Sequence, residues 1–262
     1  MKRTLLPHLP EWMPDPILSF ARDARIYDSS CSPEARVYYI EKDGGYYLKC
    51  APTTALAREA QMCEYFHKKG LGVEMLSYLS LPERDLMLTA RAAGEDCTHK
   101  LYLDDPKRLA ETIAKELRSL HECDFSDCPV QDRMQSYFAL AEENYRNGSY
   151  DKSAFPDSFG YRCAEDAYAI IKANKTALSD RVLLHGDYCL PNIMLCDWRF
   201  SAFIDLGNGG VGDRHIDLFW GAWTLGFNLG TDAYRDRFLD AYGRDRVEEE
   251  KLRIVAAAEV FG

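Results

Sequence analysis

The sequence lacks the cysteine spacing of a disulfide framework or a zinc site. Its nine cysteines are scattered and odd in number, and no two of them form a C-x-x-C pair. Scattered cysteines are typical of reduced thiols that pack inside an intracellular protein. We therefore expect free cysteines and a cytoplasmic location.

The sequence also has fewer basic than acidic residues and no long apolar run. The 262 residues carry a formal net charge of −10, whereas nucleic acids and anionic membranes select basic surfaces. The longest apolar stretch, LFWGAWTLGFNLG, is too short to span a bilayer, and prolines interrupt the basic N-terminus in a way that a signal peptide does not. We expect no nucleic-acid or membrane partner, and an acidic surface suits a cationic small molecule.

The first third of the chain reads mainly as strands. Residues 35–50 are rich in Val, Tyr and Ile around an Asp-Gly-Gly sequence at 43–45, which predicts a hairpin with a positive-φ turn. An amphipathic helix is expected over 53–70 and a further strand over 85–90.

The remainder of the chain reads mainly as helices. The helix expected over 104–123 has Asp105 as its N-cap, Pro106 in its first turn and one apolar stripe. Two more amphipathic helices are expected near the C-terminus. The sequence thus predicts an α+β fold with two lobes that meet near residues 90–95. A cleft between lobes is a favoured ligand site.

Polar side chains interrupt the strand-rich stretch VLLHGDYCLPNIMLCDWRFSAFIDLGNGG at residues 182–210. Asn192 enters the first arm of an expected hairpin, Asp205 leaves its second arm, and Asp187 lies in the loop just before it. Because the open ends of a hairpin meet, these three side chains are expected to gather at one place. Carboxylate and amide oxygens are hard ligands, which Mg²⁺ favours together with water and phosphate oxygens.

The motif HGD-x4-N followed by IDLG resembles the catalytic core of the aminoglycoside phosphotransferase family, which is related to the protein kinases. The segments YYLK, LAREAQMCEYF, LTARAAGEDC, LHECDFSDCP and GDRHIDL are similar to further parts of that family, and the similarity is closest to its 3′-phosphotransferase branch. The resemblance implies a bilobal protein-kinase-like fold. It would have an antiparallel-sheet N-terminal lobe at residues 1–90, a hinge at 91–94, and a mainly helical C-terminal lobe at 95–262 with the catalytic loop and acceptor site.

The resemblance also implies roles for the central polar residues. Asp187 would accept the proton of the substrate hydroxyl or orient that hydroxyl. Asn192 and Asp205 would hold Mg²⁺ against the phosphates of ATP. Lys49 would contact the α- and β-phosphates and pair with Glu59.

Further roles follow from the same resemblance. Ser32 lies in a segment that occupies the place of a phosphate-covering loop, although this segment contains no glycine. The backbone of Ala90 and Ala92 would contact adenine. His185 and Asp217 would support the catalytic loop and take no part in the reaction.

The acceptor site is implied less completely. The family binds polycationic drugs with acidic side chains and a C-terminal carboxylate, and the candidate residues here are Asp157, Glu259 and Phe261. The extra Gly262 displaces that carboxylate. Phe227 and Asn228 stand where 3′-type members tend to have acids.

Two other features depart from the family pattern or carry no implied role. The residue after IDLG is Asn208, where the family often has a basic residue. Phe219, Trp220, Trp223 and Phe227 recur at helical spacing, which favours core packing over a ligand platform.

The resemblance therefore implies a small-molecule kinase that transfers the γ-phosphate of ATP to a hydroxyl of an aminoglycoside and confers antibiotic resistance. One alternative keeps this chemistry but uses another hydroxylated amine or sugar as acceptor. A metallohydrolase, with ligands from His185-x-Asp187 and Asp213-x-His215-x-Asp217, leaves Lys49 without a role. A silent nucleotide-binding module has no need for Asp187.

Overall fold

The computed structural model describes residues 3–31, 35–150 and 161–262. Two compact units are present, and they comprise residues 1–94 with 201–207 and residues 95–200 with 208–262. These units differ from the expected lobes in two respects, because residues 201–207 and the expected hinge at 91–94 both belong to the first unit. Ser32 and Asp157 lie outside the described residues.

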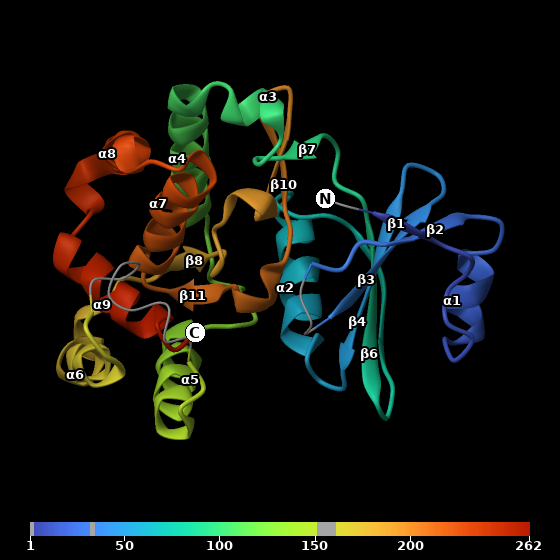
Figure 1. The fold of residues 1–262 in the computed structure, drawn as a ribbon, viewed down its shortest axis with the longest axis horizontal. Coiled ribbons are helices and arrows are strands. Elements are labelled where there is room, and N and C mark those ends of the chain that lie inside the picture. The colour runs from blue at the N-terminus through green and yellow to red at the C-terminus, as the bar shows by residue number, and fades with distance from the viewer. Residues whose placement is uncertain (1–2, 32–34, 151–160) are drawn as a thin grey trace. The chain divides into compact units, whose positions relative to one another are not determined.

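The described residues of the first unit form a six-stranded antiparallel sheet of order β1-β2-β3-β4-β6-β5 and two helices (Figure 1). Its elements are β1 (Thr4–Leu6), α1 (Asp15–Phe20), β2 (Arg25–Asp28), β3 (Arg36–Glu41), β4 (Tyr46–Pro52), α2 (Ala57–Lys68), β5 (Met75–Ser80) and β6 (Arg84–Ala90).

The hairpin of β3 and β4 forms as the sequence predicts. Asp43, Gly44 and Gly45 have φ angles of 45°, 98° and 105°, which place all three in the left-handed region that glycine favours. A Cβ atom on Gly45 would lie 2.6 Å from the hydroxyl of Tyr39, so this position also needs glycine for space. The hairpin fixes the register of β4 and therefore the position of Lys49, which lies near its middle.

The two helices of the first unit cover opposite faces of the sheet. Leu86 and Leu88 of β6 belong to a cluster with Ile17 of α1, whereas Met87 between them packs with Ala60 of α2. This alternation follows from the two-residue period of a strand. Helix α2 is thereby held on the face of the sheet that carries Met87.

The second unit is mainly helical (Figure 1). Its elements are β7 (Glu95–Asp96), α3 (Lys100–Leu103), α4 (Pro106–His121), α5 (Arg133–Asn147), α6 (Ala164–Asn174), β8 (Val182–Leu184), β9 (Ile193–Cys196), β11 (Gly210–Gly212), α7 (His215–Leu229), α8 (Arg235–Gly243) and α9 (Glu249–Glu259). Strands β8 and β11 form an antiparallel pair, and β9 lies between β7 and β10 (Arg199–Phe203), which runs on into the first unit.

Helix α4 begins and packs as its sequence predicts. The side chain of Asp105 accepts a hydrogen bond from the backbone N–H of Arg108, and Pro106 occupies the first turn. The apolar stripe is fully buried, and its members are Leu109, Ile113, Leu117 and Leu120. Helices α7 and α8 pack against α4.

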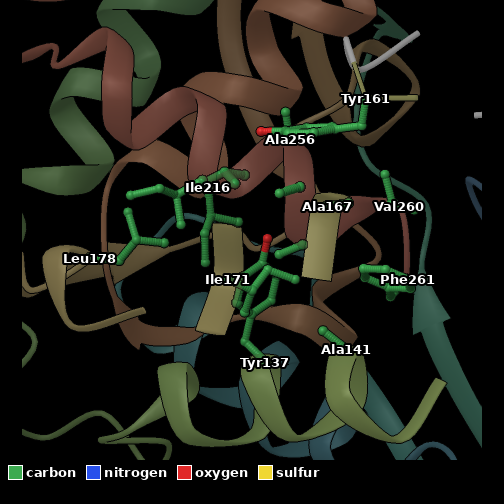
Figure 2. Close-up of a cluster of buried hydrophobic side chains, with 14 of the residues drawn as sticks. Tyr137, Ala141, Tyr161, Ala167, Ile171, Leu178, Ile216, Ala256, Val260 and Phe261 are labelled. Carbon is green, nitrogen blue, oxygen red and sulfur yellow. The ribbon is translucent and has the colours of Figure 1, made fainter. Parts of the chain in front are cut away.

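A second cluster of buried side chains joins α5, α6 and α9 (Figure 2). Tyr137 of α5, Ile171 of α6 and Phe261, which follows α9, are among its buried members. The C-terminal segment therefore forms part of the core of this unit. Within the described part of the chain, no helix is both long and apolar enough to span a bilayer.

Candidate active site

The segment after β8 is held in place by a buried carboxylate. The backbone N–H groups of His185 and Gly186 donate to the two carboxylate oxygens of Asp217, each over 2.8 Å. Gly186 has a φ of 84°, and a Cβ atom there would lie 1.9 Å from the carbonyl oxygen of Asn208. Only glycine therefore fits this turn, which begins the segment at residues 185–192 that we call the catalytic loop.

Asp217 is itself held by a buried histidine. Nε2 of His121 lies 3.1 Å from Oδ2 of Asp217, and Nδ1 lies 2.8 Å from the hydroxyl of Tyr242. Burial lowers the pKa of His121, despite the opposing effect of Asp217. A neutral ring that donates from Nε2 to the carboxylate must accept at Nδ1, so the hydroxyl of Tyr242 donates to it.

Asp187 and Asn192 form a pair within the catalytic loop. Nδ2 of Asn192 donates to Oδ2 of Asp187 over 2.8 Å and to the backbone oxygen of Asp187 over 3.0 Å. The backbone N–H of Asp187 lies 3.3 Å from Nδ1 of His185, whose side chain is fully buried. The loop thus presents a fixed carboxylate, and the His185 ring acts as a backbone anchor.

Thr224 of α7 provides a further contact to the catalytic loop. Its hydroxyl accepts a hydrogen bond from the backbone N–H of Leu190 over 3.1 Å. The thiol of Cys189 interacts with Thr224 and with Asp187, and burial raises the pKa of that thiol. Cys189 is therefore a packed thiol and not an activated nucleophile.

Three charged side chains meet in the first unit. Nζ of Lys49 lies 2.8 Å from Oε2 of Glu59 and 2.8 Å from Oδ1 of Asp205. Burial opposes the charge of Lys49, but the carboxylates of Asp205 and Glu59 outweigh it and raise the pKa of Lys49. Burial raises the pKa of Glu59, and the charge of Lys49 only partly offsets this. Lys49 consequently stays cationic.

The segment that carries Asp205 is fixed to the first unit at both ends. The backbone N–H of Phe203 donates to the carbonyl of Leu71 over 2.8 Å, and Nε of Arg58 donates to the carbonyl of Gly207 over 2.5 Å. Asp205 has a φ of 60°, a conformation that aspartate adopts more readily than most residues. These contacts explain why residues 201–207 belong to the first unit.

The segment expected to contact adenine begins with Ala90, the last residue of β6. The backbone N–H of Ala90 donates to the carbonyl of Glu74 over 2.9 Å, and that of Arg91 donates to the carbonyl of Gly45 over 3.0 Å. Ala92 is buried. The roles of Ala90 and Ala92 remain predictions.

The expected acceptor residues have different surroundings. Oε1 of Glu259 accepts a hydrogen bond from the hydroxyl of Tyr137 over 2.7 Å, and burial raises the pKa of Glu259 to about 7. The ring of Phe261 is fully buried and packs edge-on against Tyr145 and Tyr150. Helix α5 and its neighbours therefore enclose the ring, and the role of Phe261 in acceptor binding remains a prediction.

A cluster with the composition of a metal site lies elsewhere in the second unit. Asp180, Asp213 and His215 bring one ligand atom each to within 4.8 Å of one another. Nε2 of His215 accepts the backbone N–H of Glu248 over 3.0 Å, so Nδ1 donates to Asp213 over 2.7 Å. Both ring nitrogens are thus occupied, and Arg214 donates to Asp180. The cluster is a hydrogen-bonded support, which argues against a metallohydrolase.

Known proteins resemble the chain over most of its length. A model of the phosphotransferase enzyme family matches residues 33–254. A probable aminoglycoside 3′-phosphotransferase of Lactococcus lactis subsp. lactis is 51% identical over 254 residues, which cover 96% of each chain. The aminoglycoside 3′-phosphotransferase of Niallia circulans is 28% identical over 231 residues, which cover 86% of this chain and 87% of that relative.

Solved structures share the fold. An aminoglycoside 3′-phosphotransferase of type VIII superposes with a TM-score of 0.78 at 23% identity, covering 89% of this chain and 92% of that one. The aminoglycoside phosphotransferase APH(3″)-Id of Streptomyces rimosus, in complex with ADP and streptomycin, gives a TM-score of 0.71 at 24% identity and covers 87% and 91%. The predicted α+β, protein-kinase-like fold is confirmed.

Proposed function

Because the chain belongs to the phosphotransferase enzyme family, which includes the aminoglycoside 3′-phosphotransferases, we propose that it transfers the γ-phosphate of ATP to a hydroxyl of an aminoglycoside. The observation that carries the proposal for this chain is the fixed carboxylate of Asp187 beside Asn192. Phosphorylation adds negative charge to a cationic drug and weakens its binding to ribosomal RNA, so the activity would confer resistance. The cytoplasm, where ATP is present, is the proposed location.

Asp187 is the residue proposed to face the acceptor hydroxyl. A carboxylate accepts hydrogen bonds only, so the hydroxyl donates to it and its oxygen points toward the phosphorus. As the new O–P bond forms, the hydroxyl proton passes to Asp187, and the bond between the γ-phosphorus and the β–γ bridging oxygen breaks. ADP leaves with that bridging oxygen. Such a reaction needs alignment more than covalent chemistry from the protein.

Lys49 is proposed to neutralise the α- and β-phosphates. Its pairing with Glu59 supports this role, because Glu59 holds the ammonium group in one position, and Asp205 and Glu59 together raise the pKa of Lys49. The contact between Lys49 and Asp205 also supports it, because Asp205 is the proposed ligand of the magnesium ion that would bind the phosphates. Ser32 and the backbone of Ala90 and Ala92 are proposed to contact the nucleotide.

The donor chemistry of Asn192 and Asp205 fits Mg²⁺. Asn192 uses its Nδ2 group toward Asp187, so the amide oxygen Oδ1 points the other way and can serve as a ligand. The side chain of Asp205 is 51% exposed and uses Oδ1 toward Lys49, which leaves Oδ2 as a second hard oxygen. A bound magnesium ion would neutralise the charge that develops on the phosphate oxygens.

Acidic groups are proposed to attract the cationic acceptor. Glu259 has a carboxyl group whose pKa of about 7 places it at the edge of ionisation near neutral pH. A cationic amine nearby would favour its charged form. Asp157 is proposed to contribute a second acidic group for the acceptor.

The proposal is tested by a phosphate-transfer assay with matched acceptors. The purified protein is incubated with Mg-ATP and a panel of aminoglycosides that includes kanamycin B and its 3′-deoxy analogue tobramycin. Mass spectrometry should detect a phosphorylated kanamycin B and no product from tobramycin. Product from no aminoglycoside, together with turnover of a simple amino alcohol, would replace the proposal with a metabolite kinase.

A further inference from the structure

Three aromatic side chains form a continuous row along helix α7. The rings of Trp220 and Trp223 lie edge to face with centroids 5.3 Å apart, and Trp223 stacks on Phe227 with centroids 5.0 Å apart and planes 13° apart. Trp220 and Trp223 are partly buried, and Phe227 is 71% exposed. Helical spacing predicts core packing for these rings, and that prediction is wrong for the outer end of the row.

The inner end of the row lies beside an acidic group. Trp220 packs against the buried cluster that contains Ala258 and Val260, the residues on either side of Glu259, and both Trp220 and Asp187 influence the pKa of Glu259. All of these residues belong to the second unit. The row therefore starts beside the carboxyl groups that are proposed to face a cationic acceptor.

The helix that carries the row also holds the catalytic loop. Thr224 accepts the backbone N–H of Leu190, and it stands four residues after Trp220 and three before Phe227. Residues three and four apart share one face of a helix. The face of α7 that anchors the catalytic loop is consequently the face that carries the aromatic row.

The row presents ring faces rather than polar groups. The amide of Asn228, next to Phe227, donates to the carbonyl of Thr224 over 2.8 Å and lies 3.1 Å from its hydroxyl, so it is used within the helix. The face of an aromatic ring carries partial negative charge and attracts ammonium groups, and it also packs against apolar surfaces. A sugar ring with an amino substituent offers both features.

We propose that Trp223 and Phe227 form a stacking subsite for an amino-sugar ring of the acceptor. This inference rests on the proposed phosphate transfer to such a compound. The apolar face of the sugar packs on the two aromatic rings, one ammonium group lies over an aromatic face, and Glu259 lies toward the inner end of the row. The continuity of the row with Glu259 and the catalytic loop selects the small-molecule acceptor over a protein partner.

The test separates acceptor binding from nucleotide binding and from turnover. Kanamycin B and Mg-ATP kinetics are measured for the wild-type enzyme and for Trp223→Ala, Phe227→Ala, Phe227→Leu and Phe227→Tyr. Leu101→Ala is the control, because Leu101 is a large apolar side chain with 47% exposure that lies on another helix, α3. Isothermal titration calorimetry with kanamycin B alone gives the dissociation constant without turnover.

The alanine variants should raise the KM and Kd for kanamycin B by about 5- to 30-fold, with kcat and the KM for ATP within about twofold of wild type. Phe227→Tyr should keep the wild-type KM and Kd for kanamycin B. Phe227→Leu should raise both values nearly as much as Phe227→Ala does. Unchanged acceptor KM and Kd in both alanine variants, with an active wild-type enzyme, would overturn the subsite and leave the proposed function standing. A wild-type enzyme that phosphorylates no amino sugar would overturn both.

Discussion

Asn192 donates its Nδ2–H group to Oδ2 of Asp187 over 2.8 Å, so one amide fixes the carboxylate that is proposed to face the acceptor. The same side chain offers its amide oxygen to Mg²⁺. The two roles can be separated by replacing the amide with a group that keeps only the oxygen.

Asn192→Asp should retain metal-dependent nucleotide binding and lose turnover. The variant keeps an oxygen ligand but places a second carboxylate beside Asp187, where two neighbouring acids favour binding of a proton. We expect kcat at neutral pH to fall by at least about tenfold. The acid limb of the pH–rate profile should move to higher pH. Asn192→Ala, which removes the oxygen as well, should also weaken binding of Mg-ADP, and equal nucleotide affinities in the two variants would contradict a metal role.

Gly186→Ala should disrupt the catalytic loop. The new Cβ atom would lie 1.9 Å from the carbonyl oxygen of Asn208, and the φ of 84° is strained for alanine. Gly148→Ala is the control, because Gly148 has a φ of 68° and a Cβ atom added there would meet no atom within 4 Å. We expect the control to cost roughly 1–2 kcal/mol of unfolding free energy. Gly186→Ala should cost roughly 2–5 kcal/mol and reduce kcat, as chemical denaturation and steady-state kinetics would show.

Glu259→Gln should change how stability depends on pH. Burial raises the pKa of Glu259 to about 7, above its ordinary value of 4.5, so the folded state favours the protonated form. The stabilising contribution is therefore complete below about 4.5 and is lost as the pH rises through about 7. The melting temperature of Glu259→Gln should rise relative to wild type between pH 5 and about pH 8. If the melting temperatures of wild type and Glu259→Gln change with pH in parallel, the raised pKa of Glu259 is refuted.

His121→Gln should make the stability of the protein less sensitive to a decrease in pH. Burial lowers the pKa of His121 below its ordinary value of 6.5, so the folded state favours the neutral ring. The contribution is present above about 6.5 and is lost as the pH falls toward the folded pKa. As the pH falls from 7.5 to about 5.5, the melting temperature of wild type should therefore decrease more than that of His121→Gln. His121→Phe removes the donor to Asp217 and should cost about 1–3 kcal/mol; an unchanged kcat in this variant would mean that Asp217 holds the loop without it.

Local sequence signals predicted the elements that depend on neighbouring residues. The β3–β4 turn needs only its Asp-Gly-Gly sequence, and α4 needs only its Asp105 cap and its apolar stripe. The catalytic-loop motif likewise placed Asp187 and Asn192 five residues apart, a spacing that one short loop can close into a hydrogen bond.

Contacts between distant segments could not be predicted in the same way. Phe261 is buried because α5, more than a hundred residues earlier, encloses its ring. The link from His121 to Asp217 spans 96 residues, and its only sequence signal was a histidine that continues the apolar stripe of α4. The aromatic row on α7 has the spacing of a core stripe. Only the contacts of that helix in the folded protein distinguish a buried stripe from a partly exposed row.

The most direct test of the account is the effect of Asp187→Ala on turnover and on nucleotide affinity, measured with the same purified protein. If Asp187 accepts the proton of the acceptor hydroxyl, kcat should fall by about 10²- to 10⁴-fold while the dissociation constant of Mg-ADP stays within about twofold of wild type. Equal losses in turnover and nucleotide affinity, or an unchanged kcat, would contradict the account.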